Sequence, residues 1–385
     1  MKIWLKLSML AVCATLSAVS CQQEEIAVPD YRLCSATYTT HPLHERYNEL
    51  LQAYQNGTVS PGSIAGVKQA GQPAWVGATG YSNLAHQSVM DACTPFRTGS
   101  VTKVFTATVV LTLTEAGKLR LDDPVTTHLP GLRGQIPHVD EITIRQLLNH
   151  TSGLGHPTDD DVHYQLGLIN NPDYFARLTP RERLQRFVYD KPLKHLPGSR
   201  TYYSNAGYWL LEWVVEAATG KAFAESLQEW VLAPLGLTDT YLVKRVNPAV
   251  ARGYNRSGSR MQDVTRWDAA DGDGDPAAGI ISTAADLLTF GEALFGGRLV
   301  SQQSLDAMTA MFADPHCDDC GYGLGIETWK VGRFFGYGMN GSSLGVDANL
   351  IYFPEQLTTV MLFSNYGGGN RKEVIEGFVQ LSVQD

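Results

Sequence analysis

The sequence is poor in charge and, beyond its first segment, has no long hydrophobic run. Charged residues make up 18% of its 385 residues, and acidic side chains outnumber basic ones, which gives a formal net charge of −9. Without a Lys/Arg-rich segment, such a chain is a poor candidate for nucleic-acid binding. After the first segment, no apolar run approaches the roughly 18 residues that a membrane helix needs. We find no repeat with a period of about 20–50 residues.

Hydrophobic residues make up 44% of the chain, which is enough to bury a sizeable core. This composition excludes a disordered or low-complexity protein. The length allows one large domain or two interleaved ones.

The N-terminus has the features of an export signal. Two early lysines precede a largely apolar stretch over residues 7–19, and small residues then lead to a cysteine. The run Leu16-Ser17-Ala18-Val19-Ser20-Cys21 resembles a bacterial lipoprotein box, although Ala18 stands where that box prefers Leu. We predict a signal peptide over residues 1–20, lipidation of Cys21, and a place in the periplasm or cell envelope. Secretion without a lipid and a retained N-terminal helix are the alternatives.

Cys34, Cys93, Cys317 and Cys320 would remain beside Cys21 in the exported chain. In such a protein they suggest disulfides, and we expect the pairs Cys34–Cys93 and Cys317–Cys320 among the possible connectivities. With the adjacent histidine, the second pair is also a weak zinc signal. A redox-active pair is a further alternative, but no βαβ pattern surrounds it.

Apolar periodicity and turn residues place strands near both ends of the chain and helices between them. The expected helices cover residues 44–55, 100–116, 142–149, 206–218, 223–233, 283–295 and 372–383. The expected strands cover residues 63–68, 74–79, 323–328, 333–337, 344–353 and 357–364. We predict an α/β (α+β) fold in which an antiparallel sheet flanked by helices is built from both chain ends, with an inserted, mostly helical subdomain. The expected parts are a tether at 21–40, the sheet subdomain at 41–119 and 275–385, and the helical subdomain at 120–274.

The most informative segment contains Ser100 and Lys103. Gly99 allows a tight turn before the helix, and the spacing puts the hydroxyl and the amine on one helical face, about 5–6 Å apart at Cβ. Ser100 would also lie at the positive end of the helix dipole. An amine one turn away can take the proton that makes a hydroxyl a nucleophile. A helix cap followed by a surface lysine is the alternative interpretation.

A second segment ends in Tyr203-Ser204-Asn205 just before an expected helix. Together with Ser100-Val101-Thr102-Lys103, it makes the chain resemble the serine β-lactamase and penicillin-binding-protein superfamily. The resemblance is to the branch that holds class C β-lactamases, DD-carboxypeptidases and related esterases, whose first and second motifs these segments match. Further agreement runs through residues 147–153 and 278–283, so the similarity covers residues 45–382.

The resemblance implies an acyl-enzyme mechanism without a cofactor or metal. Ser100 would attack a carbonyl while Lys103 and Tyr203 share the proton transfers as a coupled pair. Asn205 would hydrogen-bond near the substrate amide. A core aromatic at the helix entry is the alternative role for Tyr203.

The third motif of the superfamily is where this sequence departs. It normally reads Lys or His, any residue, then Gly on a strand that lines the site, and the matching stretch is Tyr337-Gly338-Met339-Asn340-Gly341-Ser342. Met339 therefore stands where a cation or imidazole is expected.

The backbone of this third segment still fits a binding role. By position, the N–H groups of Ser100 and Ser342 would form the oxyanion hole, in which one donor is worth about 2.7–4 kcal/mol. Gly341 permits close approach of the backbone to a ligand. Asn340 and Gly341 are expected to lie beside the substrate.

The missing cation at Met339 has two expected consequences. Tyr203 should hold its proton more tightly, so that Lys103 carries more of the base role. An anchor for a substrate carboxylate is also missing; Asn370 or Arg371 would have to replace it, although a solvated helix start is the simpler interpretation of both. This favours an ester, a neutral amide or a modified peptide over a β-lactam.

Three other patterns suggest different chemistry. Gly341-Ser342-Ser343-Leu344-Gly345 matches the G-x-S-x-G nucleophile elbow, but the next residues are strand-like where the elbow needs a helix. His150 and His156 suggest a triad, but His150 belongs to a helix end of the superfamily and a structural role is expected. A calcium loop at Asp271-Gly272-Asp273-Gly274-Asp275 lacks the required Gly and Glu, so we expect a solvated acidic loop.

We therefore predict an exported serine hydrolase of the β-lactamase or D-Ala-D-Ala carboxypeptidase-like type. The alternatives are a carboxylesterase of the same superfamily and a penicillin- or peptidoglycan-binding protein with weak turnover. Its partners would be a small-molecule or peptide substrate and, only through the N-terminal lipid, a membrane. We expect a monomer.

Overall fold

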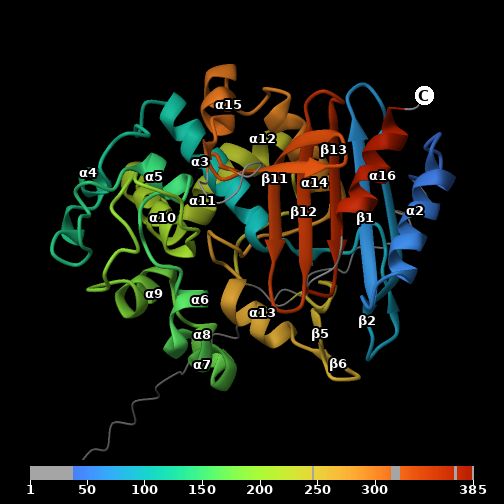
Figure 1. The fold of residues 1–385 in the computed structure, drawn as a ribbon, viewed down its shortest axis with the longest axis horizontal. Helices are drawn as coiled ribbons and strands as arrows, with labels where there is room; N and C mark the ends of the chain where they lie inside the picture. The colour runs from blue at the N-terminus through green and yellow to red at the C-terminus, as the bar shows by residue number, and fades with distance from the viewer. Residues whose placement is uncertain (1–37, 245–246, 314–320, 368–370, 384–385) are drawn as a thin grey trace, which may run out of the picture.

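The computed structural model describes residues 38–244, 247–313, 321–367 and 371–383. At its centre lies a nine-stranded antiparallel sheet in the order β3-β2-β1-β13-β12-β11-β10-β9-β8 (Figure 1). Its strands are β1 (Gly62–Gln69), β2 (Trp75–Asn83), β3 (Ser88–Val89), β8 (Phe312–Ala313), β9 (Gly321–Tyr322), β10 (Glu327–Val331), β11 (Phe334–Ser342), β12 (Asp347–Phe353) and β13 (Thr358–Ser364). Because β1 pairs with β13, the two ends of the chain meet in the middle of the sheet, as predicted.

Helices cover both faces of this sheet. On one face lie α2 (His44–Asn56) and α16 (Lys372–Ser382), and on the other lies α14 (Ala284–Phe295) (Figure 1). Successive side chains of a strand point to opposite faces, so Ile64 of β1 joins the core under α14 while Ala65 joins the core under α2 and α16. Both faces are therefore apolar, and β1 is buried nearly throughout.

The segment between the two halves of the sheet is mostly helical. It contains α4 (Val125–His128), α5 (Ile144–Leu148), α6 (Pro157–Asp160), α7 (Val162–Asn170), α8 (Pro172–Phe175), α9 (Pro180–Phe187), α10 (Asn205–Thr219), α11 (Phe223–Leu227), α12 (Ala233–Leu235) and α13 (Thr265–Gly272). A π-helical turn at Gln228–Leu232 joins α11 to α12. Two short ladders, β4 (Phe96–Arg97) with β7 (Ile281–Ser282) and β5 (Tyr254–Ser257) with β6 (Arg260–Asp263), complete it, and α15 (Gln302–Thr309) follows α14.

One helix joins the sheet to the helical segment. α3 (Thr102–Glu115) is buried from Thr102 to Leu113 and is preceded by the 3₁₀ turn Gly99–Val101. Its buried residues, which include Lys103 and several threonines, lie on every side of the helix, as expected of a helix in the interior. The first turn of α3 therefore lies deep between the two parts of the molecule.

Several expectations concern residues outside the described ranges. They are the signal peptide, the lipidation of Cys21, most of the tether, Cys34, Cys317, Cys320 and Asn370. Cys93 is disulfide-bonded. Among the described residues, no helix is long and apolar enough to cross a membrane.

Candidate active site

Ser100 and Lys103 lie where the 3₁₀ turn runs into α3. Gly99 adopts a positive φ of 51°, which favours glycine and turns the chain sharply into the helix. Lys103 Nζ donates a hydrogen bond to Ser100 Oγ at 3.1 Å. The Lys103 side chain is fully buried, so the alternative of a surface lysine after a helix cap is wrong.

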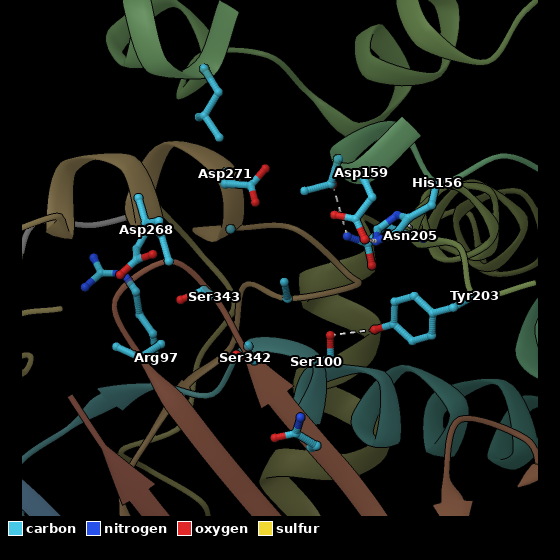
Figure 2. Close-up of a pocket in the computed structure, with 18 of the residues that line it drawn as sticks. Arg97, Ser100, His156, Asp159, Tyr203, Asn205, Asp268, Asp271, Ser342 and Ser343 are labelled. Carbon is cyan, nitrogen blue, oxygen red and sulfur yellow. Dashed lines mark hydrogen bonds and ion pairs between the residues drawn. The ribbon is translucent and has the colours of Figure 1, made fainter. Parts of the chain in front are cut away.

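The second motif reaches the same point from the start of α10. Tyr203 OH lies 2.6 Å from Ser100 Oγ, and Asn205 Oδ1 accepts a hydrogen bond from Lys103 Nζ at 2.8 Å. Ser204 caps α10, because its hydroxyl accepts from the N–H of Ala206 at 3.2 Å. The structure thus brings Ser100, Lys103, Tyr203 and Asn205 into one hydrogen-bonded group. Figure 2 shows the contact between Ser100 and Tyr203 within this group.

The two candidate histidines support this second motif. His150 is buried, its Nδ1 accepts from the N–H of Ser204 at 3.2 Å, and its ring packs on Tyr203 with 4.3 Å between centroids. His156 Nδ1 accepts from the N–H of Asn205 at 3.4 Å. In the part of the chain that the structure describes, neither ring hydrogen-bonds to Ser100, so the structural role expected for His150 agrees with its contacts.

Burial shifts the pKa values of Lys103 and Tyr203 in opposite directions. Desolvation lowers the pKa of Lys103 to about 7, although the carboxylates of Asp275, Asp271 and Glu327 act in the opposite direction. Desolvation raises the pKa of Tyr203 far above its usual value, and its hydrogen bond to Ser100 only partly opposes this. At neutral pH a large share of the lysine is therefore an uncharged amine, while the phenol keeps its proton.

Strand β11 brings the third motif against Ser100. A Cβ on Gly341 would lie 2.0 Å from Thr98 O and 2.8 Å from Ser100 N, so only glycine fits there. This close packing brings the backbone of Gly341 and Ser342 to the turn that carries Ser100. The two N–H groups expected to form the oxyanion hole thus belong to adjacent backbone segments.

No cation replaces Met339 at the position that the superfamily fills with one. Met339 is buried and lines the cavity beside Ser100. The guanidinium of Arg371 instead bonds to the side chains of Asn340 and Asp347, so the expectation of a solvated helix start is wrong for Arg371. Arg371 is not among the residues that line the cavity, and it is already bound to a carboxylate.

Glu327 is a cavity residue that the sequence motifs did not reveal. It lies on β10 opposite Gly338 of β11, and its Oε1 accepts hydrogen bonds from Asn340 N–H and Trp329 Nε1, each at 3.0 Å. Burial raises the pKa of this carboxyl, while the hydrogen bond from Asn340 lowers it. Its position depends on the register of β10 with β11, for which the sequence carries no motif.

The acidic loop is folded inward, so the expectation of a solvated loop is wrong. Asp273 forms a two-pronged ion pair with Arg97 at 2.7 and 2.9 Å. Asp275 accepts from Trp209 Nε1 at 2.6 Å and lies 3.4 Å from Arg183. Its other oxygen accepts from the N–H of Ala277 at 2.7 Å, and the carbonyl of Ala277 accepts from Lys103 Nζ at 2.8 Å. The described residues contain no group of three or more acidic, His or Cys side chains arranged to hold a metal ion.

The turn after β11 does not have the form of a nucleophile elbow. The N–H of Ser343 donates to Val346 O at 2.9 Å, and the chain then returns as β12 rather than as a helix. Ser343 faces the same cavity on the side of Asp268 (Figure 2).

These groups surround a cavity of about 630 Å³ with Ser100 in its wall. Four carboxyl groups line it, from Asp159, Asp268, Asp271 and Glu327, whereas Arg97 is held by Asp273. Burial raises the pKa of Asp268 to about 7. The cavity thus presents acidic groups to a ligand and, among its described lining residues, no unpaired Lys or Arg.

Comparison with known proteins identifies the family. The sequence model of the family described as "Beta-lactamase" matches residues 48–384. The chain belongs to the beta-lactamase family. Its nine-stranded sheet with flanking helices is the fold of that family.

Within the beta-lactamase family, the chain is similar to proteins of different named activities. Penicillin-binding protein 4 of Amycolatopsis lactamdurans is 29% identical over 71% of this chain and 72% of its own length. Esterase EstB of Burkholderia gladioli is 37% identical over 46% of each chain. A D-stereospecific amidohydrolase of Streptomyces superposes with a TM-score of 0.75 at 28% identity, covering 86% of this chain and 97% of its own.

The curated relatives are matched over 40% to 72% of their own length, so this chain corresponds to part of each. The relatives named as an esterase and as an amidohydrolase are both hydrolases. The choice between an ester, a peptide and a β-lactam depends on the cavity itself.

Proposed function

We propose that this chain is a serine hydrolase that cleaves an ester or a neutral amide through an acyl-enzyme on Ser100. The observation that carries the proposal is the position of Ser100 Oγ, 3.1 Å from Lys103 Nζ and 2.6 Å from Tyr203 OH. A buried amine with a pKa of about 7 can accept the hydroxyl proton at neutral pH.

The reaction would proceed in two steps, acylation of Ser100 and hydrolysis of the acyl-enzyme. Ser100 Oγ bonds to the substrate carbonyl carbon while its proton passes to Lys103, and the N–H groups of Ser100 and Ser342 bind the developing oxyanion. The carbon–oxygen or carbon–nitrogen bond then breaks, and the leaving group takes the proton. Water then attacks the acyl carbonyl carbon while its proton passes to Lys103. The ester bond to Ser100 breaks, Ser100 Oγ takes that proton, and the carboxylic acid leaves.

Tyr203 serves in this proposal as a hydrogen-bond donor and not as the base. Its phenol is buried and its pKa is raised, so an anionic form would be strongly disfavoured at neutral pH. A protonated Tyr203 can still donate to the oxygen that leaves or attacks and can relay a proton to it.

The cavity favours a substrate without a carboxylate. Met339 supplies no positive charge, Arg371 is bound to Asp347, and the carboxyl of Glu327 lies beside the third motif. An anionic group brought into such a site meets acidic side chains and no free cation among the described lining residues. This supports an ester or neutral amide over β-lactams and D-Ala-D-Ala peptides, both of which carry a carboxylate.

We further propose that the protein is exported and anchored in the cell envelope by a lipid on Cys21. The apolar leader and the small residues before that cysteine support this. The substrate would then be a small molecule or peptide met outside the cytoplasm, and the protein would act as a monomer without a cofactor.

Intact-mass measurement after addition of substrate tests the acyl-enzyme directly. The purified chain should gain the acyl mass from a p-nitrophenyl ester, and peptide mapping should place the adduct on Ser100. Ser100→Ala should remove both the adduct and the turnover. Turnover of the ester by Ser100→Ala at the rate of the unmodified chain would refute the proposal.

A substrate panel tests the specificity. We expect the ester to exceed a chromogenic cephalosporin and a D-Ala-D-Ala peptide in kcat/KM. Met339→Lys should raise the cephalosporin-to-ester ratio, whereas Met339→Leu should not. A stable penicillin adduct without turnover of any substrate would indicate a binding protein instead.

A further inference from the structure

We propose that an apolar surface beside the catalytic cavity binds an aliphatic or aromatic acyl substituent of the substrate. This surface, called here the acyl shelf, is formed by Ile169, Val264, Trp267 and Leu344. The inference rests on the proposed hydrolysis of esters or neutral amides at Ser100.

The acyl shelf is continuous with the catalytic cavity. It lines a hollow of about 190 Å³, and two of its members, Ile169 and Leu344, also line the cavity that contains Ser100. The two side chains therefore belong both to the cavity of Ser100 and to the shelf. Leu168 and Val346 extend the apolar lining on the catalytic side.

The shelf presents large apolar side chains that the fold leaves uncovered. Ile169 is 57% exposed and Leu344 is 48% exposed. Single exposed apolar side chains are ordinary, but adjoining ones at the rim of a cavity mark a ligand surface. Ile169 lies on α7, Leu344 in the β11–β12 turn and Trp267 on α13, so three separate elements bring these side chains to one place.

The shelf is held in place by a specific contact. Trp267 Nε1 donates to Ile169 O at 3.1 Å and ties the start of α13 to the end of α7. The indole thereby satisfies its polar atom and leaves its apolar surface to the hollow. The other side of the hollow is polar and is lined by Asn255, Arg256, Ser257 and Gln262. Asn255 donates through its amide to Leu344 O at 2.7 Å, and Arg256 Nε donates to Gly258 O at 2.9 Å.

The shelf lies within reach of the acyl carbon. Leu344 follows Ser342 by two positions, and two residues of chain span at most about 7 Å. The N–H of Ser342 is the expected donor to the oxyanion, so the substituent on the same carbonyl carbon has a short path to Leu344. Figure 2 shows Ser342 and Ser343 on the wall that runs from Ser100 toward Asp268. A chain of several methylene groups, or an aromatic ring, fits this path and the size of the hollow.

A chain-length series measures the contribution of the shelf. The probes are p-nitrophenyl acetate, butyrate and octanoate, used below the concentration at which they aggregate. Burial of a methylene group is worth about a fourfold increase in binding. We therefore expect kcat/KM for octanoate to exceed that for acetate by at least about tenfold.

Variants of the shelf should remove this preference. In Ile169→Ser and Leu344→Ser the ratio of kcat/KM for octanoate to that for acetate should fall several-fold, and in the double variant it should approach one. Val162→Ser is the matched control, because Val162 is a 55% exposed apolar residue of the same helix that lines neither hollow. It should keep the full ratio, and thermal midpoints should show that all variants are folded.

The outcomes separate the shelf from the proposed hydrolysis. Turnover that persists in Ser100→Ala would overturn the proposed function. Hydrolysis that depends on Ser100 but shows no rise from acetate to octanoate would overturn the shelf alone. An unchanged chain-length ratio in the double shelf variant, or an equal loss in Val162→Ser, would overturn it as well.

Discussion

At the scale of single residues, the proposed chemistry depends on Lys103, whose pKa the fold brings close to neutral pH. Lys103 makes hydrogen bonds to Ser100, Asn205 and the carbonyl of Ala277, and burial lowers its pKa to about 7. The acidic groups around it prevent a larger fall, because each favours the ammonium form. The lysine is therefore poised between its two protonation states at neutral pH.

The first prediction concerns the pH dependence of acylation. Only the uncharged amine can accept the proton of Ser100, so kcat/KM should rise with pH through about 7 and level off above it. Lys103→Arg should cost about 10²–10⁴-fold, because a guanidinium stays protonated, whereas Tyr203→Phe should cost less. Rates for Lys103→Arg close to those of the unmodified chain would contradict the assignment of the base.

A second measurement refines the same prediction. Asp271→Asn removes a negative charge that raises the pKa of Lys103, so the rising limb should move to lower pH. A limb that stays in place or moves upward would show that another group controls it. Steady-state profiles between about pH 5 and 9 with a neutral ester suffice, because that substrate does not titrate in this range.

The second prediction concerns Gly341. A Cβ at this position would meet Thr98 O at 2.0 Å, so Gly341→Ala must push β11 away from the turn that carries Ser100. We expect a loss of about 10²–10³-fold in kcat, the cost of one misplaced oxyanion donor. Gly131→Ala is the control, since a Cβ there has no neighbour within 4 Å. Full activity in Gly341→Ala would exclude this strand from the oxyanion hole.

At the scale of elements, a buried arginine joins the helical segment to the loop that carries Asp271 and Asp275. Arg183 of α9 is 2% exposed and donates to Tyr164 OH at 2.8 Å and Ala270 O at 2.8 Å. Asp275 in turn holds Ala277, whose carbonyl accepts from Lys103. A chain of contacts thus connects α9 to the proposed base.

The third prediction follows from this arrangement. Arg183→Met leaves the buried carboxylate of Asp275 without its cation, so the free energy of unfolding should fall by about 3–5 kcal/mol, measured by urea denaturation at neutral pH. Arg266→Met removes an exposed ion pair with Asp173 and should leave the denaturation midpoint nearly unchanged. Equal stability of the two variants would contradict a structural role for Arg183.

Local signals in the sequence were sufficient for the longest helices and strands, but not for the short helices α4, α6–α9, α13 and α15 or the short strands β3–β9. The helix at α2, the β1–β2 hairpin and the cap of Thr283 on α14 depend on neighbours in the chain and lie close to their expected positions. The expected strand 323–328 instead begins at Glu327, because Gly325 adopts a positive φ and the preceding residues form a turn.

The features of the candidate site that the sequence did not predict involve residues whose partners are distant in the sequence. The acidic loop looked solvated because nothing near it in sequence reveals the arginines at positions 97 and 183. Glu327 reaches the cavity only through the pairing of β10 with β11. The proximity of Ser100, Lys103 and Tyr203 was expected because the resemblance, and not any periodicity, connects the two motifs.

At the scale of the whole molecule, the sheet separates two cores with different roles. One core, under α2 and α16, contains Trp75 and Phe378 and takes no part in lining the catalytic cavity. The other lies under α14 and continues around α3 into the helical segment. Stability and chemistry can therefore be changed independently on the two faces.

The fourth prediction tests that independence. Phe378 is fully buried, with its ring 5.8 Å from those of Tyr47 and Trp75, so Phe378→Ala should lower the free energy of unfolding by about 3–5 kcal/mol. The kcat/KM of the folded fraction should stay the same. Val383→Ala, an exposed position just beyond α16, should change neither quantity. A large fall in kcat/KM at temperatures where Phe378→Ala is fully folded would show that the faces are coupled.

The pairing of β1 with β13 also governs when the molecule can begin to work during its synthesis. Ser100, the proposed nucleophile, is made early, but the strand that carries Ser342, its proposed oxyanion partner, and the strands that complete the sheet are made last. A ribosome-bound or prematurely terminated polypeptide ending before β11 would hold Ser100 without Ser342 and so remain inert. Contacts between such remote parts of a chain also form slowly. Reactivity should therefore emerge abruptly, at the end of maturation.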